Sequence, residues 1–487
     1  MPRLHELTAY QLRSTLISGD ISAEELIHSI FERIQRVEEK IKGFITLLKD
    51  DALKRAKEID NKIKKSQIKG QIIGLPIAIK DVICTQNVRT TCGSKMLDNY
   101  IPPYNATVIN NILQEGGIII GKTNMDEFAM GTTTESSYYG ITHNPWNLAC
   151  VPGGSSGGSG AVIAADESII SLGSDTGGSV RCPASFCNVT GLKSTYGLIS
   201  RYGLVSYACS LEQIGPLTKD VRDCALLLNV IVGHDPYDST TIKLQKKDYL
   251  ANLDKNVKGL RIGIPKEFMG EGTDEIVSKT IWEAVHLLEG HGATYEEISI
   301  PLIGYSVPCY YIIAMSEASS NLARYDGMRY GYRVMNDEGE WNKVFAEDRM
   351  AFGPEVRRRI MLGTYALSAG YYDMYYLKAL KVRTLLKKQF EKQFKFSDVI
   401  IGPTMPTTAF KIGEKIFDPL SMYRADIDTV ASNITGLPAI SIPCGFSDGL
   451  PIGLQITGNL LQEELLLRVA YKFQQLTDYH KKKPSLR

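Results

Sequence analysis

Short apolar segments alternate with helical patterns beyond residue 70, and this alternation restricts the possible folds more than any other feature of the chain. The apolar runs at residues 72–82, 118–121 and 168–173 have the length of buried strands, whereas residues 105–115 and 159–165 have helical spacing. Strands and helices that alternate in this way form a sheet covered by helices on both faces. The sequence therefore predicts the α/β class.

The first 65 or so residues carry helical signals instead. Ser22 and Glu25 form a capping-box pattern in front of apolar residues at helical spacing. Asp50 could cap a second, charged helix over residues 51–65. We expect this N-terminal segment to wrap around a core formed by the rest of the chain.

A second helical region interrupts the α/β pattern. Residues 310–394 look mostly helical and are dense in Tyr, Arg and Lys, and strand-like segments return at residues 398–401, 439–443 and 452–457. Because α/β pattern lies on both sides of the helical region, the sequence predicts a single domain over residues 1–487. Its N-terminal helical segment covers about 1–65, and a helical insertion covers about 310–394.

The charge balance and hydropathy exclude some functions. The 487 residues include 55 basic and 54 acidic side chains, which argues against a chain that binds nucleic acid by itself. The N-terminus carries charges where a signal peptide would be apolar, and no run approaches the roughly 18 apolar residues of a membrane span. We therefore expect a soluble, cytoplasmic protein that does not associate with membranes.

The cysteines do not indicate a metal site. Nine cysteines are present, and Cys182 and Cys187 come closest to ligand spacing, but no second pair or histidine follows in zinc-site register. An odd number of cysteines with mostly apolar or glycine-rich flanks is typical of reduced, buried thiols in a cytosolic protein. The sequence predicts no bound metal and no cofactor in this chain.

Two glycine–serine clusters, at residues 153–159 and 173–179, are the strongest chemical signal. Neither has the Lys-Ser/Thr pair of a Walker A loop or the pattern of a dinucleotide-binding loop. Residues 153–157 satisfy G-x-S-x-G, but the later histidines, at positions 234, 286, 291 and 480, lie in a turn, a helix and its end, and a basic tail. A hydrolase with a catalytic histidine is therefore not indicated.

A lysine base fits these serines better. Lys80 ends the apolar run at residues 75–79, and burial at the end of a strand lowers the pKa of a lysine. Each feature alone could be a flexible loop or a solvated lysine, because most lysines are exposed. Together they favour a serine nucleophile, with glycine-rich backbone amides that could face a developing oxyanion.

These segments resemble the amidase signature family, whose members share a Ser–cis-Ser–Lys triad. The resemblance implies the amidase-signature fold, a large mixed β-sheet with helices on both faces. It implies Ser179 as nucleophile, Ser155 as the bridging serine on a cis peptide and Lys80 as base. It also implies that the backbone amides of residues 176–179 donate hydrogen bonds to the oxyanion. These residues are Thr176, Gly177, Gly178 and Ser179 itself.

Further segments resemble the A subunits of glutamine-dependent tRNA amidotransferases more closely than general amidases. They are residues 191–197, 210–217, 234–240, 316–327, 358–364 and 436–440, and they extend the similarity over nearly the whole chain. Such subunits hydrolyse glutamine and pass ammonia to a B subunit, which amidates glutamate, or aspartate, on mischarged tRNA; a small C subunit completes the complex. ATP and Mg²⁺ are then expected at the partner, as is most contact with tRNA.

The same resemblance implies that Tyr310, Arg359 and Asp426 select glutamine. An arginine suits the α-carboxylate of free glutamine, and an aspartate suits its α-ammonium group. Neighbouring residues leave alternatives open: Tyr311 for the tyrosine, Arg357 or Arg358 for the arginine, and Asp428 for the aspartate.

Two other functions remain possible at this point. The chain could be a free-standing amidase signature hydrolase of small amides, or a scaffold that keeps the fold without catalysis. A preference for other amides over glutamine would favour the first, and an unreactive Ser179 would favour the second.

Overall fold

The computed structural model describes residues 3–65, 67, 69–270, 272–334, 340–416 and 418–486. Residues 335–339 of the predicted helical insertion lie outside the described residues. Eleven strands form one sheet, in the order β1-β3-β2-β4-β6-β5-β10-β11-β9-β7-β8. The strands are β1 (Phe44–Leu47), β2 (Pro76–Lys80), β3 (Ile118–Thr123), β4 (Ile170–Asp175), β5 (Thr190–Lys193), β6 (Gln213–Thr218), β7 (Arg261–Pro265), β8 (Thr294–Ile298), β9 (Val399–Pro403), β10 (Ala439–Ser447) and β11 (Leu450–Gly458).

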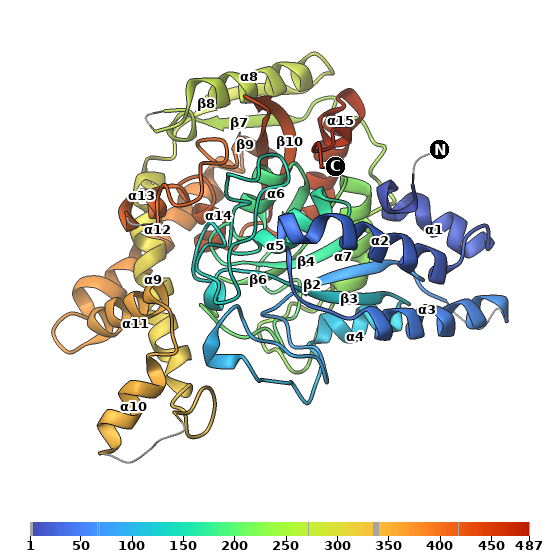
Figure 1. Ribbon diagram of the computed structural model, residues 1–487. Helices are drawn as coiled ribbons and strands as arrows, with labels where there is room; N and C mark the ends of the chain where they lie inside the picture. Colours follow the sequence, from blue (N-terminus) through green and yellow to red (C-terminus); the bar gives the residue numbers. More distant parts are fainter. Residues whose placement is uncertain are drawn as a thin grey trace.

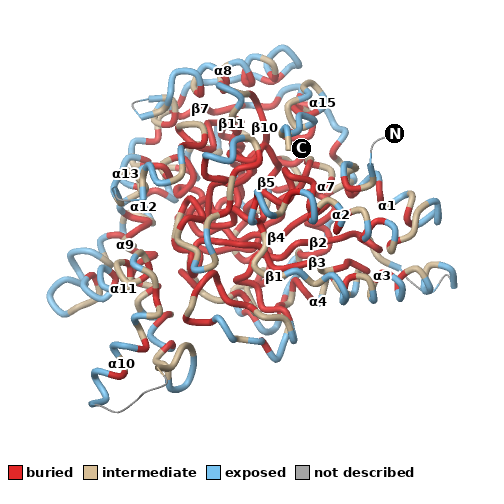
Figure 2. Tube along the Cα trace, viewed as in Figure 1, coloured by how far each residue is buried: buried red, intermediate tan, exposed pale blue. Residues whose placement is uncertain are grey.

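The sheet is mixed. Strands β3, β2 and β4 run parallel to one another, as do β9, β7 and β8, whereas β4, β6, β5, β10, β11 and β9 pair antiparallel in turn. The predicted α/β class and mixed sheet are confirmed. Strands β2, β4, β5, β6 and β9 are buried along their whole length, and Figure 2 shows this buried centre. Only a sheet with both faces covered buries complete strands in this way.

Helices supply that cover. They are α1 (Ala9–Ser18), α2 (Ala23–Ile41), α3 (Lys49–Lys64), α4 (Thr107–Gln114), α5 (Gly157–Ala164), α6 (Arg181–Cys187), α7 (Val221–Ile231), α8 (Glu275–Glu289), α9 (Ser306–Asn321), α10 (Trp341–Arg349), α11 (Pro354–Leu367), α12 (Lys378–Gln393), α13 (Pro419–Arg424), α14 (Val430–Thr435) and α15 (Glu463–Leu476). Helices α5 and α6 pack together over the sheet, and α7 packs with α15. None of the described helices is both long and apolar enough to span a bilayer.

The N-terminal segment differs from the prediction in two details. Residues 44–47 form β1, which pairs with β3 at the edge of the sheet. Four residues are too few to show a periodicity in sequence, and β3 supplies the pairing that makes them a strand. Asp50 does not cap the next helix, because α3 starts at Lys49 and its N-cap position is Leu48. The capping box of Ser22 and Glu25 is present at the start of α2.

The predicted strand at residues 72–82 is also shorter than expected. Gly74 has a φ of 74°, a left-handed conformation that interrupts an extended strand, so β2 begins only at Pro76. Between β8 and β9 the chain forms helices α9 to α12. Figure 1 shows these helices on the side of the sheet opposite the N-terminal helices α1 and α3.

Candidate active site

Lys80 lies at the last position of β2, where the sheet brings two strand ends together. Because β2 and β4 are parallel neighbours, their carboxyl ends meet at the same edge of the sheet. The Nζ atom of Lys80 lies 2.7 Å from Oγ of Ser155 and 3.0 Å from Oγ of Ser174, near the end of β4. The lysine is fully buried. Its amine therefore contacts one of the two serines that the sequence indicated for catalysis.

Burial sets the charge of this amine. Desolvation lowers the pKa of Lys80 from 10.5 to about 7, against the opposing effect of the carboxylates of Asp126 and Asp175. A lysine with this pKa is uncharged in a large share of molecules near neutral pH. An uncharged amine can accept a proton from a hydroxyl group, which the ordinary ammonium form cannot do.

Ser155 sits in a segment pressed against the end of β4. The peptide bond between Gly154 and Ser155 is cis. The next hydroxyl, Oγ of Ser156, accepts from the backbone amide of Ser174 at 3.2 Å and donates to its carbonyl at 3.1 Å. A Cβ atom on Gly173 would lie 2.8 Å from Oγ of Ser156, so the contact requires glycine. The small glycine and serine residues of the two clusters therefore allow the segment around Ser156 to lie directly against the end of β4.

Ser179 is held beside this segment. Its carbonyl accepts from the amide of Ser156 at 3.2 Å, and the residue is 8% exposed. The serine ends a turn that begins at Asp175, the last residue of β4. The structure thus places Lys80, Ser155 and Ser179 in adjoining segments at this edge of the sheet, and their roles as a triad remain a prediction from the family resemblance.

A buried ion pair shapes the turn that carries Ser179. The carboxylate of Asp175 accepts two hydrogen bonds from Arg181, each of 3.0 Å, and further ones from the backbone amides of Gly178 and Val180. Although burial opposes ionisation, Arg181 holds the pKa of Asp175 well below its usual range. Such bidentate, charge-assisted bonds fix the conformation of the turn.

The same carboxylate changes the expected set of oxyanion donors. The amide of Gly178 lies 2.8 Å from Oδ1 of Asp175 and is already engaged. The amides of Thr176, Gly177 and Ser179 have no hydrogen-bond acceptor within the described part of the chain. These three amides remain available to a developing negative oxygen, whereas Gly178 shapes the turn.

Helix α9 brings Tyr310 against the turn. A Cβ atom on Gly177 would lie 2.5 Å from Cζ of Tyr310, so glycine is required where the ring touches the backbone. Tyr310 is buried, and its ring lies edge-on to that of Tyr311 at 4.9 Å. Sequence motifs alone did not indicate that this tyrosine touches the turn that carries Ser179, whose backbone amides are the candidate oxyanion donors.

Arg359, on helix α11, is a buried cation that lies beside Tyr311. It is 2% exposed, and its guanidinium lies 5.3 to 5.6 Å from the ring centres of Tyr207, Tyr311 and Tyr423. Its Nε atom donates to Glu355 at 2.8 Å and its Nη1 atom to the hydroxyl of Tyr207 at 2.7 Å. The Nη2 donors have no partner among the described residues. They are free for an anionic ligand group.

Asp426 faces the same tyrosines from the segment between α13 and α14. Its carboxylate accepts from the hydroxyl of Tyr311 at 2.6 Å and from Thr132 at 3.2 Å. Burial raises the pKa of Asp426 to about 7, with Tyr311 and Arg359 acting against the shift. Thr429, on the same segment, donates to the carbonyl of Gly177 at 2.6 Å, which fixes this segment to the proposed oxyanion turn.

The geometry separates the candidates that the sequence left open. Arg357 contacts Sδ of Met350, and Arg358 pairs with Glu355 with 41% of its side chain exposed. Neither reaches the tyrosine cluster as Arg359 does. Tyr311 is occupied with Asp426, which leaves Tyr310 beside the turn. Asp428 is buried, and burial raises the pKa of its carboxyl group well above the usual range.

Several residues of the site were not indicated by the sequence motifs. Tyr207 and Tyr423 reach Arg359 from distant parts of the chain, whereas Glu355 lies one helical turn before it on α11. Tyr423 also donates to Glu355 at 2.8 Å. Asp126 was likewise missed. Its amide donates to the carbonyl of Ser155 at 3.2 Å, and its carboxylate accepts from Thr134 and Ser136. Within the described residues, no group of three His, Cys, Asp or Glu side chains is arranged to hold a metal ion.

Comparison with known proteins agrees with this architecture. A family model described as Amidase matches residues 25–467. The chain belongs to the amidase signature family. It is similar to the A subunit of the glutamyl-tRNA(Gln) amidotransferase of Thermoanaerobacter pseudethanolicus, with 58% identity over 479 residues and 98% of each chain covered. The protein of the same name from Caldanaerobacter subterraneus is 57% identical over 471 residues, which cover 97% of this chain and 96% of that one.

A solved structure matches as well. The crystal structure of the glutamyl-tRNA(Gln) amidotransferase A subunit from Thermotoga maritima superimposes with a TM-score of 0.83 at 41% sequence identity. The match covers 99% of this chain and 98% of that chain. The fold class and the family that the motifs indicated are therefore confirmed.

Proposed function

We propose that this chain is the glutamine-hydrolysing subunit of a tRNA-dependent amidotransferase. One observation carries the proposal: a buried cation, Arg359, and a buried carboxylate, Asp426, are both anchored through tyrosines to the turn that carries Ser179. Glutamine has a carboxylate and an ammonium group on its α-carbon that match these charges, and a carboxamide at its other end. A simple amide has no groups for either partner.

Catalysis begins with proton transfer. Uncharged Lys80 accepts the proton of Ser155, which in turn takes the proton of Ser179, and Oγ of Ser179 attacks the carboxamide carbon of glutamine. The carbonyl oxygen becomes negative in the tetrahedral intermediate. The free amides of Thr176 and Gly177 stabilise it, an effect typically worth about 3 kcal/mol per donor.

The intermediate then collapses. The C–N bond breaks, and the leaving nitrogen takes up the transferred proton and departs as ammonia. The γ-glutamyl group remains as an ester on Ser179. Water, deprotonated through the same serine–lysine chain, attacks this ester, restores the Ser179 hydroxyl and releases glutamate. Burial of Lys80 supports both steps because it keeps the amine near neutrality at cellular pH.

The names of the relatives support a place for this chain in a larger assembly. We assign the amidation of glutamate on tRNA, or of aspartate, to an amidotransferase B subunit that receives the ammonia, together with a small C subunit. ATP and Mg²⁺ belong to that partner, because this chain has no Walker A lysine. The nearly balanced charge of the chain fits a subunit that leaves most tRNA contact to its partner.

Ser179→Ala tests the proposal. In the assembled complex, release of glutamate from glutamine should fall by about three orders of magnitude or more, because loss of a nucleophile removes the covalent route. Ser185→Ala is the matched control, since Ser185 is a buried serine on α6 outside the site, and it should keep wild-type activity. Full glutaminase activity in Ser179→Ala would refute the assignment, and faster turnover of neutral aryl or alkyl amides than of glutamine would indicate a free-standing amidase.

A further inference from the structure

The turn at residues 126–129, shortly after β3, has a backbone that the proposed reaction does not explain. Phe128 and Ala129 have φ angles of 50° and 60°, a left-handed conformation that residues with a side chain rarely adopt. Such residues persist only where the surrounding structure enforces them, and they gather at functional sites. All four residues of the turn are buried. The turn therefore requires an explanation of its own.

One end of the turn holds the segment that carries Ser155. The amide of Asp126 donates to the carbonyl of Ser155 at 3.2 Å. A Cβ atom on Gly154 would lie 2.1 Å from Oδ2 of Asp126 and 2.5 Å from the backbone nitrogen of Thr133, so this contact requires glycine. Asp126 thus fixes the turn directly to the proposed bridging serine.

The other end of the turn holds the start of helix α11. Oε2 of Glu127 accepts from the backbone amide of Gly353 at 2.7 Å, and Gly353 is the N-cap residue of α11. The amides at the start of a helix have no partner within the helix, so an acceptor from elsewhere can fix this end. Glu127 is 3% exposed, and its other carboxylate oxygen accepts from the hydroxyl of Ser94. The carboxylate is therefore held from two sides.

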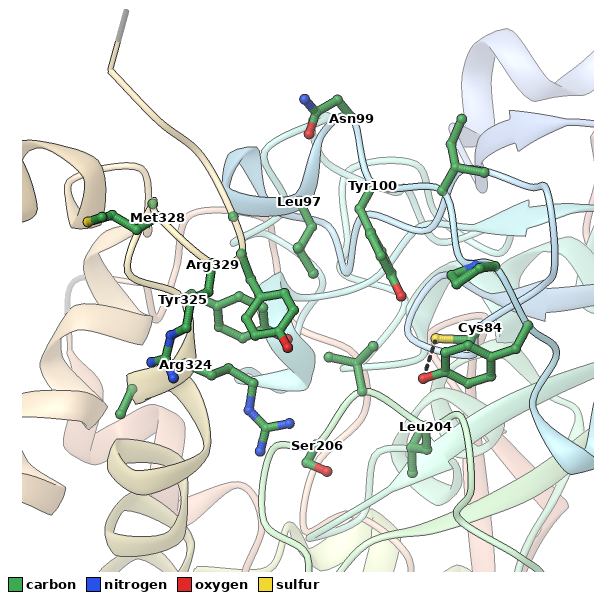
Figure 3. Close-up of a pocket in the computed structure, with 18 of the residues that line it drawn as sticks. Cys84, Leu97, Asn99, Tyr100, Leu204, Ser206, Arg324, Tyr325, Met328 and Arg329 are labelled. Carbon is green, nitrogen blue, oxygen red and sulfur yellow. Dashed lines mark hydrogen bonds between the residues drawn. The ribbon is translucent and has the colours of Figure 1, made fainter. Parts of the chain in front are cut away.

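Aromatic rings add to the contact with α11. The ring of Phe128 lies 5.5 Å from that of Phe352, the residue before Gly353, and 5.2 Å from that of Tyr325. Tyr325 also lines the surface cleft that Figure 3 shows. Aromatic pairs at such distances pack favourably. The turn therefore contacts the start of α11 through rings as well as through a hydrogen bond.

Helix α11 carries the arginine that we propose for glutamine binding. Arg359 lies in the first half of this helix, and Glu355, which accepts from its Nε atom at 2.8 Å, lies in the first helical turn. Both residues move if the start of the helix moves. A displaced start would therefore shift the Nη2 donors of Arg359 away from a substrate bound at Ser179.

We propose that the turn at residues 126–129 fixes helix α11 relative to Ser155. Glu127 is then a positioning residue, which acts on glutamine through Arg359. The inference rests on the proposed function for the identity of the substrate. A glutamate that only stabilised the fold would affect binding and catalysis alike, whereas this role predicts a change in KM with the triad left intact.

Glu127→Ala tests this role in the assembled complex. The KM for glutamine should rise about tenfold, the lower end of what loss of a charged hydrogen bond costs, because a displaced Arg359 binds the α-carboxylate less well. The chemical step is intact, so kcat should change little. Glu127→Gln keeps an acceptor for the amide of Gly353 and should restore KM. Glu463→Ala is the matched control and should leave KM unchanged, since Glu463 is a buried glutamate that accepts a backbone amide, that of Thr195, at 2.7 Å.

A second measurement examines the triad without glutamine recognition. A sulfonyl fluoride that has no carboxylate or ammonium group reacts with Oγ of Ser179: the S–F bond breaks, an O–S bond forms, and fluoride leaves with the hydroxyl proton. Mass spectrometry follows the rate of labelling. Glu127→Ala should be labelled at the wild-type rate, whereas Lys80→Met should be labelled much more slowly.

Gly353→Ala changes the same contact from the helix. Its Cβ atom would lie 2.3 Å from Oε2 of Glu127, so the methyl group should displace the carboxylate from the amide and raise KM in the same way. When Glu127→Ala and Gly353→Ala are combined, this overlap is absent, so the two effects should not add. If thermal melting shows that Glu127→Ala does not fold, Gly353→Ala decides the question.

The outcomes separate the two proposals. If the wild-type complex hydrolyses glutamine and KM is unchanged in both Glu127→Ala and Gly353→Ala, the inference is wrong and the proposed function stands. The inference is also wrong if kcat and the labelling rate of Ser179 fall along with glutamine binding, or if Glu463→Ala raises KM equally, because either result indicates general support of the fold. If the wild-type complex does not hydrolyse glutamine, both proposals fail.

Discussion

The catalytic centre and the surroundings of Arg359 and Asp426 are built in different ways. Lys80 and Asp175 stand at the ends of neighbouring parallel strands. Ser179 follows Asp175 in a short turn, and Ser155 lies in the segment before α5, which hydrogen bonds of Ser156 join to Ser174 and Ser179. Arg359 and Asp426 instead come from helices and a loop that the sheet does not order, and tyrosine side chains hold them in place.

This difference separates two tasks. Residues fixed at strand ends suit catalysis, because small displacements of the reacting groups lower the reaction rate strongly. Helices that pack through side chains can change which substrate groups are recognised without moving the strand ends. We therefore expect substitutions in the first region to lower kcat and substitutions in the second to raise KM.

The largest effect should come from Lys80→Met, which removes the base but keeps an unbranched side chain. The rate constant kcat for glutamine hydrolysis should fall by about 10²–10⁴, the usual contribution of a general base. Steady-state kinetics on the assembled complex measure it, and KM should change little. Lys193→Met is the control, because Lys193 is also fully buried, with a pKa that burial lowers to about 7, yet it bonds to the carbonyl of Ser194. Equal losses in both variants would contradict a specific role for Lys80.

The next largest effect should come from Arg359→Gln. Loss of a charged hydrogen-bond donor to a carboxylate costs about 1.5–3 kcal/mol, or roughly a 10- to 150-fold change. We expect this change mainly in KM for glutamine. Arg357→Gln is the control and should leave KM unchanged, because its side chain contacts Met350 at the surface. A loss in kcat alone for Arg359→Gln would remove the distinction between the two regions.

The smallest effect, for a change of one pH unit, is a dependence on pH, in which the two regions should differ. The pKa of Lys80 is lowered to about 7, and its neutral form is the active one, so kcat should rise with pH through about 7. The pKa of Asp426 is raised to about 7, and its ionised form binds ammonium, so glutamine binding should also strengthen as pH rises. Below pH 7, kcat should therefore fall about tenfold per unit, and kcat/KM more steeply.

Asp426→Asn sharpens this comparison. The variant should bind glutamine weakly, but its kcat/KM should fall only about tenfold per pH unit, because Lys80 alone still titrates. Rate measurements between pH 5.5 and 8.5 decide the point. If kcat/KM falls as steeply with pH in Asp426→Asn as in the wild type, the protonation of Asp426 does not affect glutamine binding.

Sequence patterns indicated the candidate catalytic residues through local signals. Lys80 ends a strand, and both serines lie in glycine-rich segments, so each signal is local. The strand pairing that joins them follows from their common α/β pattern. The pattern did not reveal that Asp175 engages the amide of Gly178, because a turn of this kind depends on the ion pair with Arg181.

Prediction of the second region was less complete. The family resemblance indicated Tyr310, Arg359 and Asp426, but not the residues that hold them. Tyr207 lies 152 residues before Arg359, and Tyr423 lies 68 residues after Glu355. No periodicity in the sequence links these tyrosines to α11. Strand β1 was missed for a similar reason, since only its pairing with β3 distinguishes it from the helices around it.

The sequence by itself determined the α/β class and the family, because strand patterns and glycine-rich motifs are encoded by neighbouring residues, and the family resemblance implied the three residues of the proposed triad. Tertiary structure decided which arginine is buried, which tyrosine touches the turn and which amides stay free. Burial and contact between distant segments exist only after the chain has packed, and these in turn set the charges of Lys80 and Asp426.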